Sequence, residues 1–113
     1  MKQGPVLSGY DLMWLFVMFD LPTTTKKERK AAAAFRNRLL DQGFDMLQFS
    51  VYHRLFKSTR AADNVMDEVG RDIPEGGRVF GMMVTDRQYE NARIYHGKSL
   101  PKGGKNPPQL ALF

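Results

Sequence analysis

The sequence predicts an α+β fold of the ferredoxin-like type, an antiparallel sheet with both helices on one of its faces. A continuous apolar run indicates a central strand, two amphipathic patterns indicate helices, and alternating patterns between them indicate further strands. The order is β-α-β-β-α-β. The predicted strands cover residues 12–19, 44–56 (divided into two) and 78–85, and the predicted helices cover residues 25–42 and 60–72.

One additional C-terminal strand is predicted at Ala92 to His96, where a small four-stranded unit has no room for it. A sheet with helices on one side also leaves its other face bare, and a second copy is the simplest way to cover that face. We therefore expect a homodimer with strand exchange, in which this strand pairs with the partner's sheet.

Length and composition indicate one ordinary globular domain, with 113 residues, 42% apolar and 26% charged. The absence of cysteine excludes disulfides and thiolate metal sites. No apolar run has the length of a membrane span, and no secretory signal is recognised, so we expect a cytoplasmic protein. We expect a flexible N-terminal extension at residues 1–11, the domain at 12–97 and a flexible C-terminal tail at 98–113.

The continuous apolar run from Leu12 to Phe19 is typical of a strand buried on both faces. It ends at Asp20, because Pro22 cannot continue the strand. The threonines that follow are natural N-caps, and Gly43 is suited to end the first helix. We expect this helix to bury Ala32, Phe35 and Leu39, with Ala31 and the stem of Arg36 close by.

The stretch 44–56 is too long for a single strand at about 3.3 Å per residue, so we expect a split near Gln48 to Ser50. The second helix has an apolar stripe at Ala62, Val65, Met66, Val69 and Ile73. A turn at Pro74 to Gly77 precedes the strand at Arg78 to Thr85, and a short helical turn is expected at Asp86 to Asn91.

Positive charge is concentrated on the first helix. Residues 26–38 hold six cations and one acid, Glu28, which equals the net charge of +5 of the whole chain. Such clustering indicates a partner that carries phosphate groups, although a solvated helix face is the commoner reason for a charged run. The candidate nucleic-acid-binding residues are Lys26, Lys27, Arg29, Lys30, Arg36, Arg38, Arg54 and Arg78.

Few residues are candidates for catalysis. His53 and His96 have no metal-ligand spacing, and no nucleotide-binding or zinc motif is present. Asp20 lies at the carboxyl end of the predicted central strand, where it is either a helix-capping or turn residue or a ligand of a hard cation such as Mg²⁺. In a symmetric dimer the two copies of Asp20 could share a metal ion across the axis.

A family resemblance runs through the passage LFVMFDLPTTTKKERKAAAAFRNRLLDQGFDMLQFSVYHRL, residues 15–55. It resembles the opening half of CRISPR-associated protein 2, the small dimeric partner of the spacer integrase, in its strand ending FDLP, its basic helix and its GFDMLQFSVY segment. The later PEGG turn and TDRQYEN segment resemble the form found beside type II systems. The resemblance covers residues 12–97, and the extension before Leu12 departs from the family's usual start.

The resemblance implies a ferredoxin-like homodimer whose last strand crosses to the other protomer. Such dimers sit between two dimers of CRISPR-associated protein 1 and hold the middle of a spacer-precursor DNA duplex. The family is also described as a metal-dependent endonuclease on RNA or DNA, with a strand-end aspartate as metal ligand. That implies a catalytic and metal-binding role for Asp20, with Mg²⁺ or Mn²⁺ shared across the dimer axis.

Two functions from different classes follow, a non-catalytic scaffold for DNA and a metal-dependent nuclease. The scaffold is favoured because cations are abundant and catalytic groups are scarce. A third, a ferredoxin-like small-molecule sensor or regulatory dimer, would explain the fold but not the basic helix.

The chain ends in an apolar pentapeptide, QLALF, after a Lys/Gly/Pro-rich tail. One interpretation is a short strand that docks on the dimer or on the integrase by edge pairing. The other is a sliding-clamp docking peptide, because QLALF resembles the pentapeptide by which bacterial proteins bind the replication clamp. The matching positions are Gln109, Leu110, Leu112 and Phe113.

Overall fold

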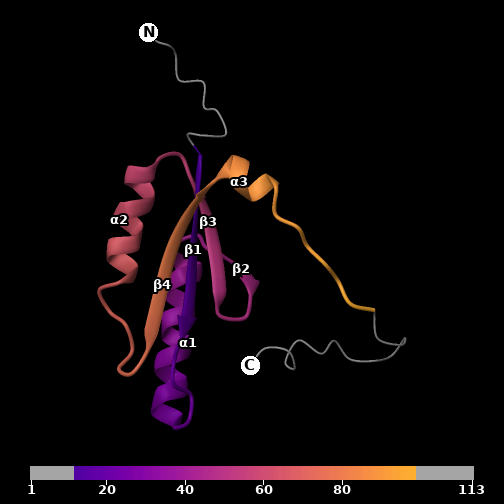
Figure 1. Cartoon of the computed structure of the whole chain (residues 1–113). Helices are drawn as coiled ribbons and strands as arrows, with labels where there is room; N and C mark the ends of the chain where they lie inside the picture. Colours follow the sequence, from indigo (N-terminus) through magenta and orange to yellow (C-terminus); the bar gives the residue numbers. More distant parts are fainter. Residues whose placement is uncertain (1–11, 99–113) are drawn as a thin grey trace.

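Strand β1 (Met13–Asp20) lies inside the sheet and pairs antiparallel with a neighbour on each side. The computed structural model describes residues 12–98. The sheet has four strands in the order β2-β3-β1-β4, the others being β2 (Asp45–Gln48), β3 (Val51–Phe56) and β4 (Arg78–Thr85) (Figure 1). The predicted α+β, ferredoxin-like arrangement is confirmed.

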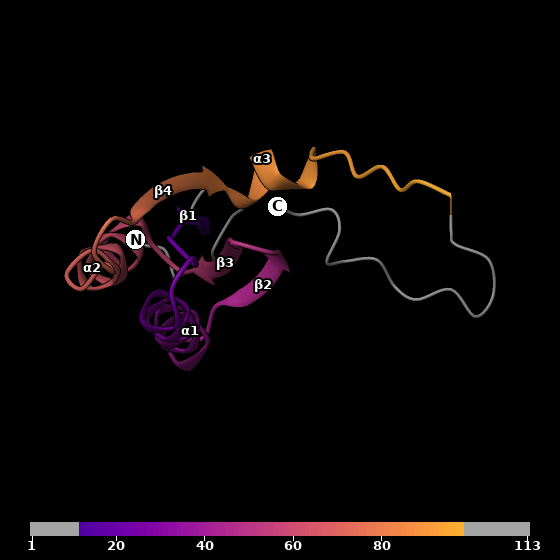
Figure 2. The same ribbon diagram turned by 90° about the horizontal axis from the view of Figure 1, so that it is seen from below.

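Two helices cover the same face of this sheet, α1 (Lys26–Asp41) and α2 (Thr59–Val69) (Figure 2). A capping box begins α1, because Thr25 Oγ1 accepts the backbone N–H of Glu28 at 3.0 Å while the Glu28 carboxylate accepts that of Thr25 at 2.9 Å. Gly43 follows the helix with a φ of 89°, the left-handed conformation expected of the residue that ends it.

The core lies between the helices and the sheet face that they cover. Gly81 of β4 lies against the side chain of Met66 in α2, and a Cβ at this position would overlap it, so the glycine lets α2 approach the sheet closely. The predicted apolar stripes of both helices contribute to this core. Its buried members are Leu15, Val17, Ala32, Phe35, Leu39, Phe44, Tyr52, Phe56, Ala62 and Val69.

Two details of the helices differ from the prediction. Arg36 is exposed, so its stem does not belong to the buried face of α1. The second helix ends at Val69 and not at Asp72, because Gly70 follows as its C-cap and donates its N–H to the carbonyl of Met66. The end of the apolar stripe survives this change, since the partly buried Ile73 still packs against the core.

The predicted split of residues 44–56 is confirmed. Phe49 and Ser50 connect β2 and β3, and Ser50 has a φ of 64°, which is uncommon for a residue other than glycine. The register shifts between Met46 and Gln48, so a bulge bends the edge strand beside this turn.

The sheet face opposite the helices is apolar and only partly covered. We call it the open face, and its residues are Trp14, Phe16 and Met18 of β1, Val51, His53 and Leu55 of β3, and Phe80, Met82 and Val84 of β4. Phe80 and Met82 are 55% and 48% exposed. The prediction that the first strand is buried on both faces is therefore wrong for the single chain, because helices cover one face alone.

After β4 the chain forms the short helix α3 (Asp86–Glu90), where a helical turn was predicted. Residues 92–98 then form no regular structure, and the side chains of Ile94 and Tyr95 are 73% and 81% exposed. The segment predicted as a strand at residues 92–96 therefore pairs with none of the strands that the structure describes in residues 12–98. Its pairing with a second copy stays a prediction.

Several predictions concern residues outside the described range 12–98. They are the extension at residues 1–11, nearly all of the tail, and the docking peptide with Gln109, Leu110, Leu112 and Phe113. Within the described range, none of the helices has both the length and the apolar character needed to cross a bilayer.

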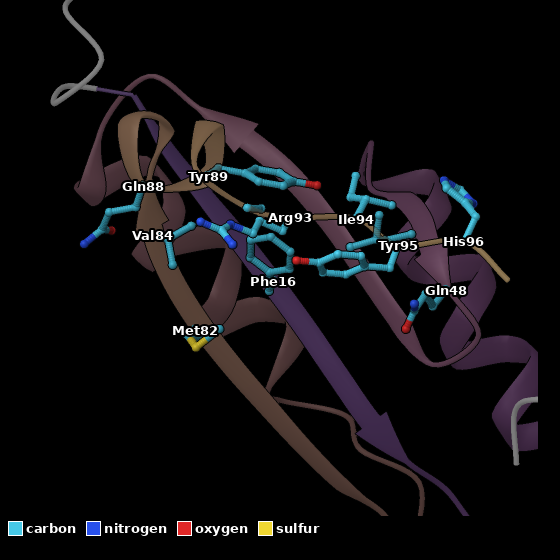
Figure 3. Close-up of a pocket in the computed structure, with 12 residues that line it drawn as sticks. Phe16, Gln48, Met82, Val84, Gln88, Tyr89, Arg93, Ile94, Tyr95 and His96 are labelled. Carbon is cyan, nitrogen blue, oxygen red and sulfur yellow. The ribbon is translucent and has the colours of Figure 1, made fainter.

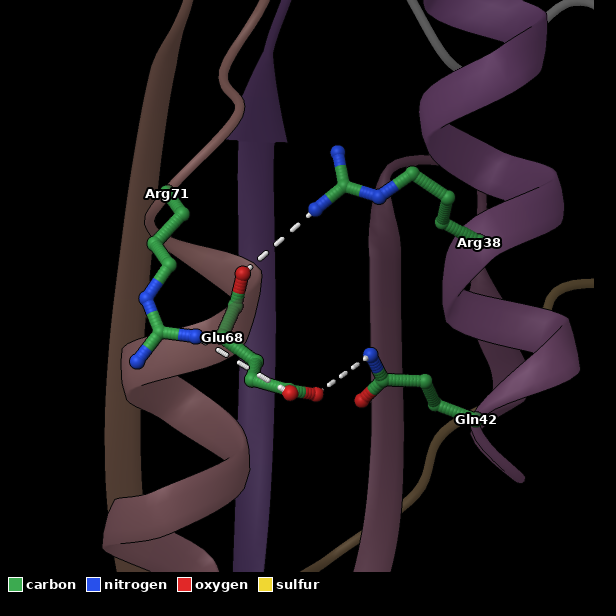
Figure 4. A network of polar contacts seen from close by, with 4 residues as sticks. All are labelled: Arg38, Gln42, Glu68 and Arg71. Atoms are coloured by element: carbon green, nitrogen blue, oxygen red, sulfur yellow. Dashed lines mark hydrogen bonds and ion pairs between the residues drawn. The ribbon is translucent and has the colours of Figure 1, made fainter.

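The end of α2 is held against α1 by Arg38 and its neighbours (Figure 4). Arg38 donates through Nη1 to the carbonyl of Asp72 at 2.8 Å and through Nη2 to that of Glu68 at 3.5 Å. The Glu68 carboxylate accepts from the side-chain amide of Gln42 at 3.4 Å and lies 3.9 Å from the Arg71 guanidinium. Arg38 thus connects α1 to the last turn of α2 and to the loop that follows it.

We predict that Arg38→Ala lowers the free energy of unfolding by about 1–2 kcal/mol, because it removes hydrogen bonds from a charged donor. Arg36→Ala is the matched control, since Arg36 lies on the same helix and is exposed. Urea unfolding of both variants measures the difference. Equal stabilities would show that Arg38 does not hold the two helices together.

Candidate nucleic-acid interface and carboxylate site

Asp20 is the last residue of β1 and is exposed at one end of the open face. Arg78, the first residue of β4, lies directly opposite it in the strand register. With Met18, Phe19 and Phe80 they line a shallow hollow of about 220 Å³. The capping interpretation of Asp20 is not supported in the described part of the chain, because Thr25 caps α1.

A metal ion at Asp20 needs more ligands than one chain provides. No group of three or more His, Asp or Glu side chains that could hold an ion occurs within residues 12–98. Mg²⁺ prefers several oxygen ligands, and Arg78 brings a positive charge to the same hollow. The single chain therefore does not fit Mg²⁺ or Mn²⁺ by itself, and the metal stays a prediction that depends on a second copy of Asp20.

The start of the basic helix already holds a carboxylate. Glu28 Oε1 accepts the backbone N–H groups of Thr24 and Thr25, both at 2.9 Å. This negative charge occupies the helix end that would otherwise attract an anion. A phosphate group is therefore expected to contact the side chains of α1 and not its N-terminal amides.

Four of the predicted cations on α1 point into solvent without a hydrogen bond or ion pair to residues 12–98. They are Lys26, Lys27, Lys30 and Arg36. Arg29 is also exposed, but its Nη1 donates to the carbonyls of Thr23 and Thr24 at 3.2 and 2.9 Å. The side chains best placed to contact phosphates are thus the first four.

The other predicted arginines have contacts within the fold. Arg54 donates to the carbonyl of Gln42 at 2.7 Å, and its guanidinium lies 4.3 Å from the centroid of the Phe56 ring. Arg54 thereby supplies a hydrogen-bond donor to the C-cap carbonyl of α1. The Arg78 guanidinium lies 5.4 Å from the centroid of the Phe80 ring, beside Asp20. The nucleic-acid role of these three arginines stays a prediction.

An aromatic cluster at the other end of the open face was missed by the sequence analysis. The Trp14 ring lies 4.9 Å from the His53 ring and 4.8 Å from the Tyr89 ring, between centroids. The Tyr89 hydroxyl lies 3.2 Å from His53 Nδ1, and Trp14 Nε1 donates to Asp86 Oδ1 at 2.8 Å. The signal that could have found the cluster is the strand register, which places His53 opposite Phe16.

A groove of about 700 Å³ lies between the open face and residues 92–96. Phe16, Met82 and Val84 line it from the sheet. Ile94 and Tyr95 line it from the C-terminal segment, and Figure 3 shows the Tyr95 hydroxyl pointing back toward Phe16. We call this space the C-terminal groove.

Burial lowers the pKa of His53 below its ordinary value of 6.5, and the carboxylate of Asp45 opposes this effect. Trp14, Phe16 and Tyr89 are the other groups around the imidazole. In the tautomer protonated at Nε2, the neutral ring can accept the Tyr89 hydroxyl at Nδ1. Burial of the imidazole is what disfavours protonation of His53 in the folded chain.

We predict that the folded state loses stability as the pH falls below about 6.5, because the unfolded chain takes up a proton at His53 first. His53→Gln should reduce the fall in melting temperature between about pH 7.5 and about pH 5.5. His96→Gln, at an exposed histidine, is the matched control and should keep the wild-type pH dependence. Identical pH profiles for the wild type and His53→Gln would contradict this assignment.

Comparison with known proteins gives the family. The model described as CRISPR associated protein Cas2 matches residues 13–92. A protein of Paracidovorax avenae named CRISPR-associated endoribonuclease Cas2 is 51% identical over 108 residues, which cover 96% of this chain and 100% of that relative. Proteins with the same name from Flavobacterium psychrophilum and Parvibaculum lavamentivorans are 41% and 43% identical, covering 95% and 89% of this chain and 93% and 100% of their own length. The resemblance is thereby confirmed, and the chain belongs to the CRISPR-associated protein Cas2 family.

Proposed function

We propose that this chain acts in CRISPR adaptation as a homodimeric scaffold, which bridges dimers of the integrase CRISPR-associated protein 1 and holds the spacer-precursor DNA duplex. The supporting observation is the imbalance between two kinds of side chain. Four cations of α1 are exposed and unpaired within residues 12–98, whereas the carboxylate of Asp20 has no second acid in its hollow. A small-molecule sensor on this fold would use the C-terminal groove but leave those cations unexplained.

The homodimer is supported by the open face and the C-terminal segment. Large apolar side chains such as Phe80 and Tyr95 are exposed, and each contributes roughly 1.5–3 kcal/mol when it is fully buried. A second copy packed on the open face would bury them in both chains at once, since a two-fold interface uses the same surface twice.

The exposed cations of α1 are suited to holding a duplex without reading its sequence. Lysine and arginine side chains that contact phosphates give affinity that depends on salt and hardly on base sequence. The Glu28 carboxylate at the helix start keeps phosphates away from the backbone amides there. The duplex would therefore lie along the exposed side of α1.

We predict that replacing Lys26, Lys27, Lys30 and Arg36 together with Ala weakens duplex binding equally for unrelated sequences. The slope of log affinity against log salt should become shallower by about 0.9 for each phosphate that the variant no longer neutralises. Fluorescence anisotropy with two duplexes of different sequence, over a range of salt concentrations, measures both effects.

Lys57→Ala with Arg60→Ala is the control, because these exposed cations lie near the start of α2 and not on α1. An unchanged slope in the α1 variant, or an equally weakened affinity in the control, would show that the duplex binds elsewhere.

A second function, metal-dependent cleavage of RNA or DNA, is supported by the position of Asp20 and by the relatives' name, CRISPR-associated endoribonuclease Cas2. Two copies of Asp20 facing each other in a dimer would supply the carboxylates for Mg²⁺ or Mn²⁺. Such an ion, when bound, polarises a phosphate or activates water. Asp20 would hold it, and Arg78 in the same hollow would attract the phosphate.

We predict that Asp20→Asn abolishes metal-dependent cleavage and leaves duplex binding and melting temperature nearly unchanged, because the Asp20 side chain is exposed and has no hydrogen bond to residues 12–98. Gel assays on labelled RNA and DNA with Mg²⁺ or Mn²⁺ measure cleavage. Wild-type cleavage by the variant would remove Asp20 from the catalytic role, and a large drop in melting temperature would give it a structural one.

A further inference from the structure

Helix α3 is attached to the sheet by contacts from its first residue, Asp86, and its fourth, Tyr89. At its start, the backbone N–H of Asp86 donates to the carbonyl of Leu12 at 2.9 Å, and Asp86 Oδ1 accepts from Trp14 Nε1 at 2.8 Å. Further along, the Tyr89 hydroxyl lies 3.2 Å from His53 Nδ1. We call Trp14, His53, Asp86 and Tyr89 the α3 anchor. It joins α3 to β1 and to β3 at the same time.

The anchor also fixes how the chain leaves α3. A capping box begins the helix, with Gln88 N–H donating to Thr85 Oγ1 at 3.0 Å and Thr85 N–H donating to Gln88 Oε1 at 2.8 Å. At its end, Ala92 N–H donates to the carbonyl of Tyr89 at 2.9 Å. Ala92, the first residue of the C-terminal segment, is therefore hydrogen-bonded to an anchor residue.

The path of residues 92–98 that α3 fixes in this way leads away from β4, one of the two edge strands of the sheet. Strand β4 is one edge of the sheet and β2 is the other. Figures 1 and 2 both show residues 92–98 leaving α3 on the side of β2 and continuing past the sheet. The segment therefore cannot pair along the free edge of its own β4.

Where the segment passes the open face it encloses the C-terminal groove and does not fill it. Ile94 and Tyr95 remain largely exposed on this path. A segment held at one end loses less conformational freedom when it binds than a free tail does. The contacts of α3 thus hold the segment at one end, and its apolar side chains stay available to a second copy.

We propose that the α3 anchor positions residues 92–98 for the sheet of a second copy, so that Trp14, His53, Asp86 and Tyr89 determine the stability of the dimer without belonging to the exchanged strand. This inference rests on the proposed homodimer. It assigns positioning roles to side chains that lie in the domain itself.

The test compares dimer dissociation in full-length variants. Asp86→Ala combined with Tyr89→Phe removes the two polar side-chain contacts of the anchor and keeps the Tyr89 ring. We expect the dissociation constant from sedimentation equilibrium to rise by about tenfold or more. Asp86→Asn keeps a side-chain oxygen for Trp14 Nε1 and should stay near the wild type. Glu90→Ala, at an exposed residue of the same helix, is the matched control.

Two spectroscopic measurements separate positioning from folding. Trp14 is the chain's single tryptophan, so its emission reports directly on the anchor and should shift to longer wavelength in the double variant. The chain has no cysteine, so Lys98→Cys gives one spin-label site per protomer. The distribution of distances between the two labels should be narrow in the dimer and broad when the anchor is removed. Circular dichroism checks that the variants fold. If the double variant does not fold, the single variant Tyr89→Phe replaces it in both measurements.

The outcomes distinguish this inference from the proposed function. A monomeric wild-type chain at all concentrations would contradict the homodimer itself. A dimeric wild type with the same dissociation constant and label distances as the anchor variants would contradict the anchor alone. An equal rise of the dissociation constant in Glu90→Ala would also overturn it, because the effect would then belong to α3 in general.

Discussion

The pairing of β1 with strands on both sides is the constraint on which the rest of the structure depends. Leu15 and Val17 are completely buried beneath the helices, while the residues that alternate with them along the strand face the open side. Because successive side chains of β1 point to opposite faces of the sheet, this one strand contributes both to the core and to the open face. Its last residue, Asp20, and its second, Trp14, lie at opposite ends of that open face. The carboxylate site, the α3 anchor and the C-terminal groove all include residues of this strand.

The arginines divide between the fold and the surface. Arg38 donates to carbonyls in the last turn of α2 and in the loop after it, and Arg54 donates to the C-cap carbonyl of α1, while Arg36 is exposed. In the sequence all three are simply basic residues, and all three were predicted to bind nucleic acid. Charge counting indicates that a phosphate partner is favoured, but it does not show which cations are already used by backbone carbonyls far away in the sequence.

Local chemistry made most of the fold predictable. Gly43 ends α1, the length of residues 44–56 predicts the split that separates β2 from β3, and β4 spans the predicted residues Arg78–Thr85. The α3 anchor was not predictable in this way, because Trp14 and Asp86 are 72 positions apart and meet only through the strand register. The carboxylate position was predicted, since Pro22 marks the strand end, but its neighbour Arg78 follows from the register alone.

A metal ion shared by two Asp20 residues and an exchange of residues 92–98 both restrict how two copies can be oriented in the dimer. Asp20 and the α3 anchor are separated by six residues of β1, which is about 20 Å. Consider two copies that pack open face to open face. A two-fold axis across the middle of β1 would put each Asp20 over the partner's α3, far from the other Asp20. An axis nearly parallel to β1 brings the two Asp20 residues together and also brings the two α3 ends together, where residues 92–98 can cross to the opposite sheet. A shared metal ion and an exchanged strand are therefore compatible in one of these two arrangements.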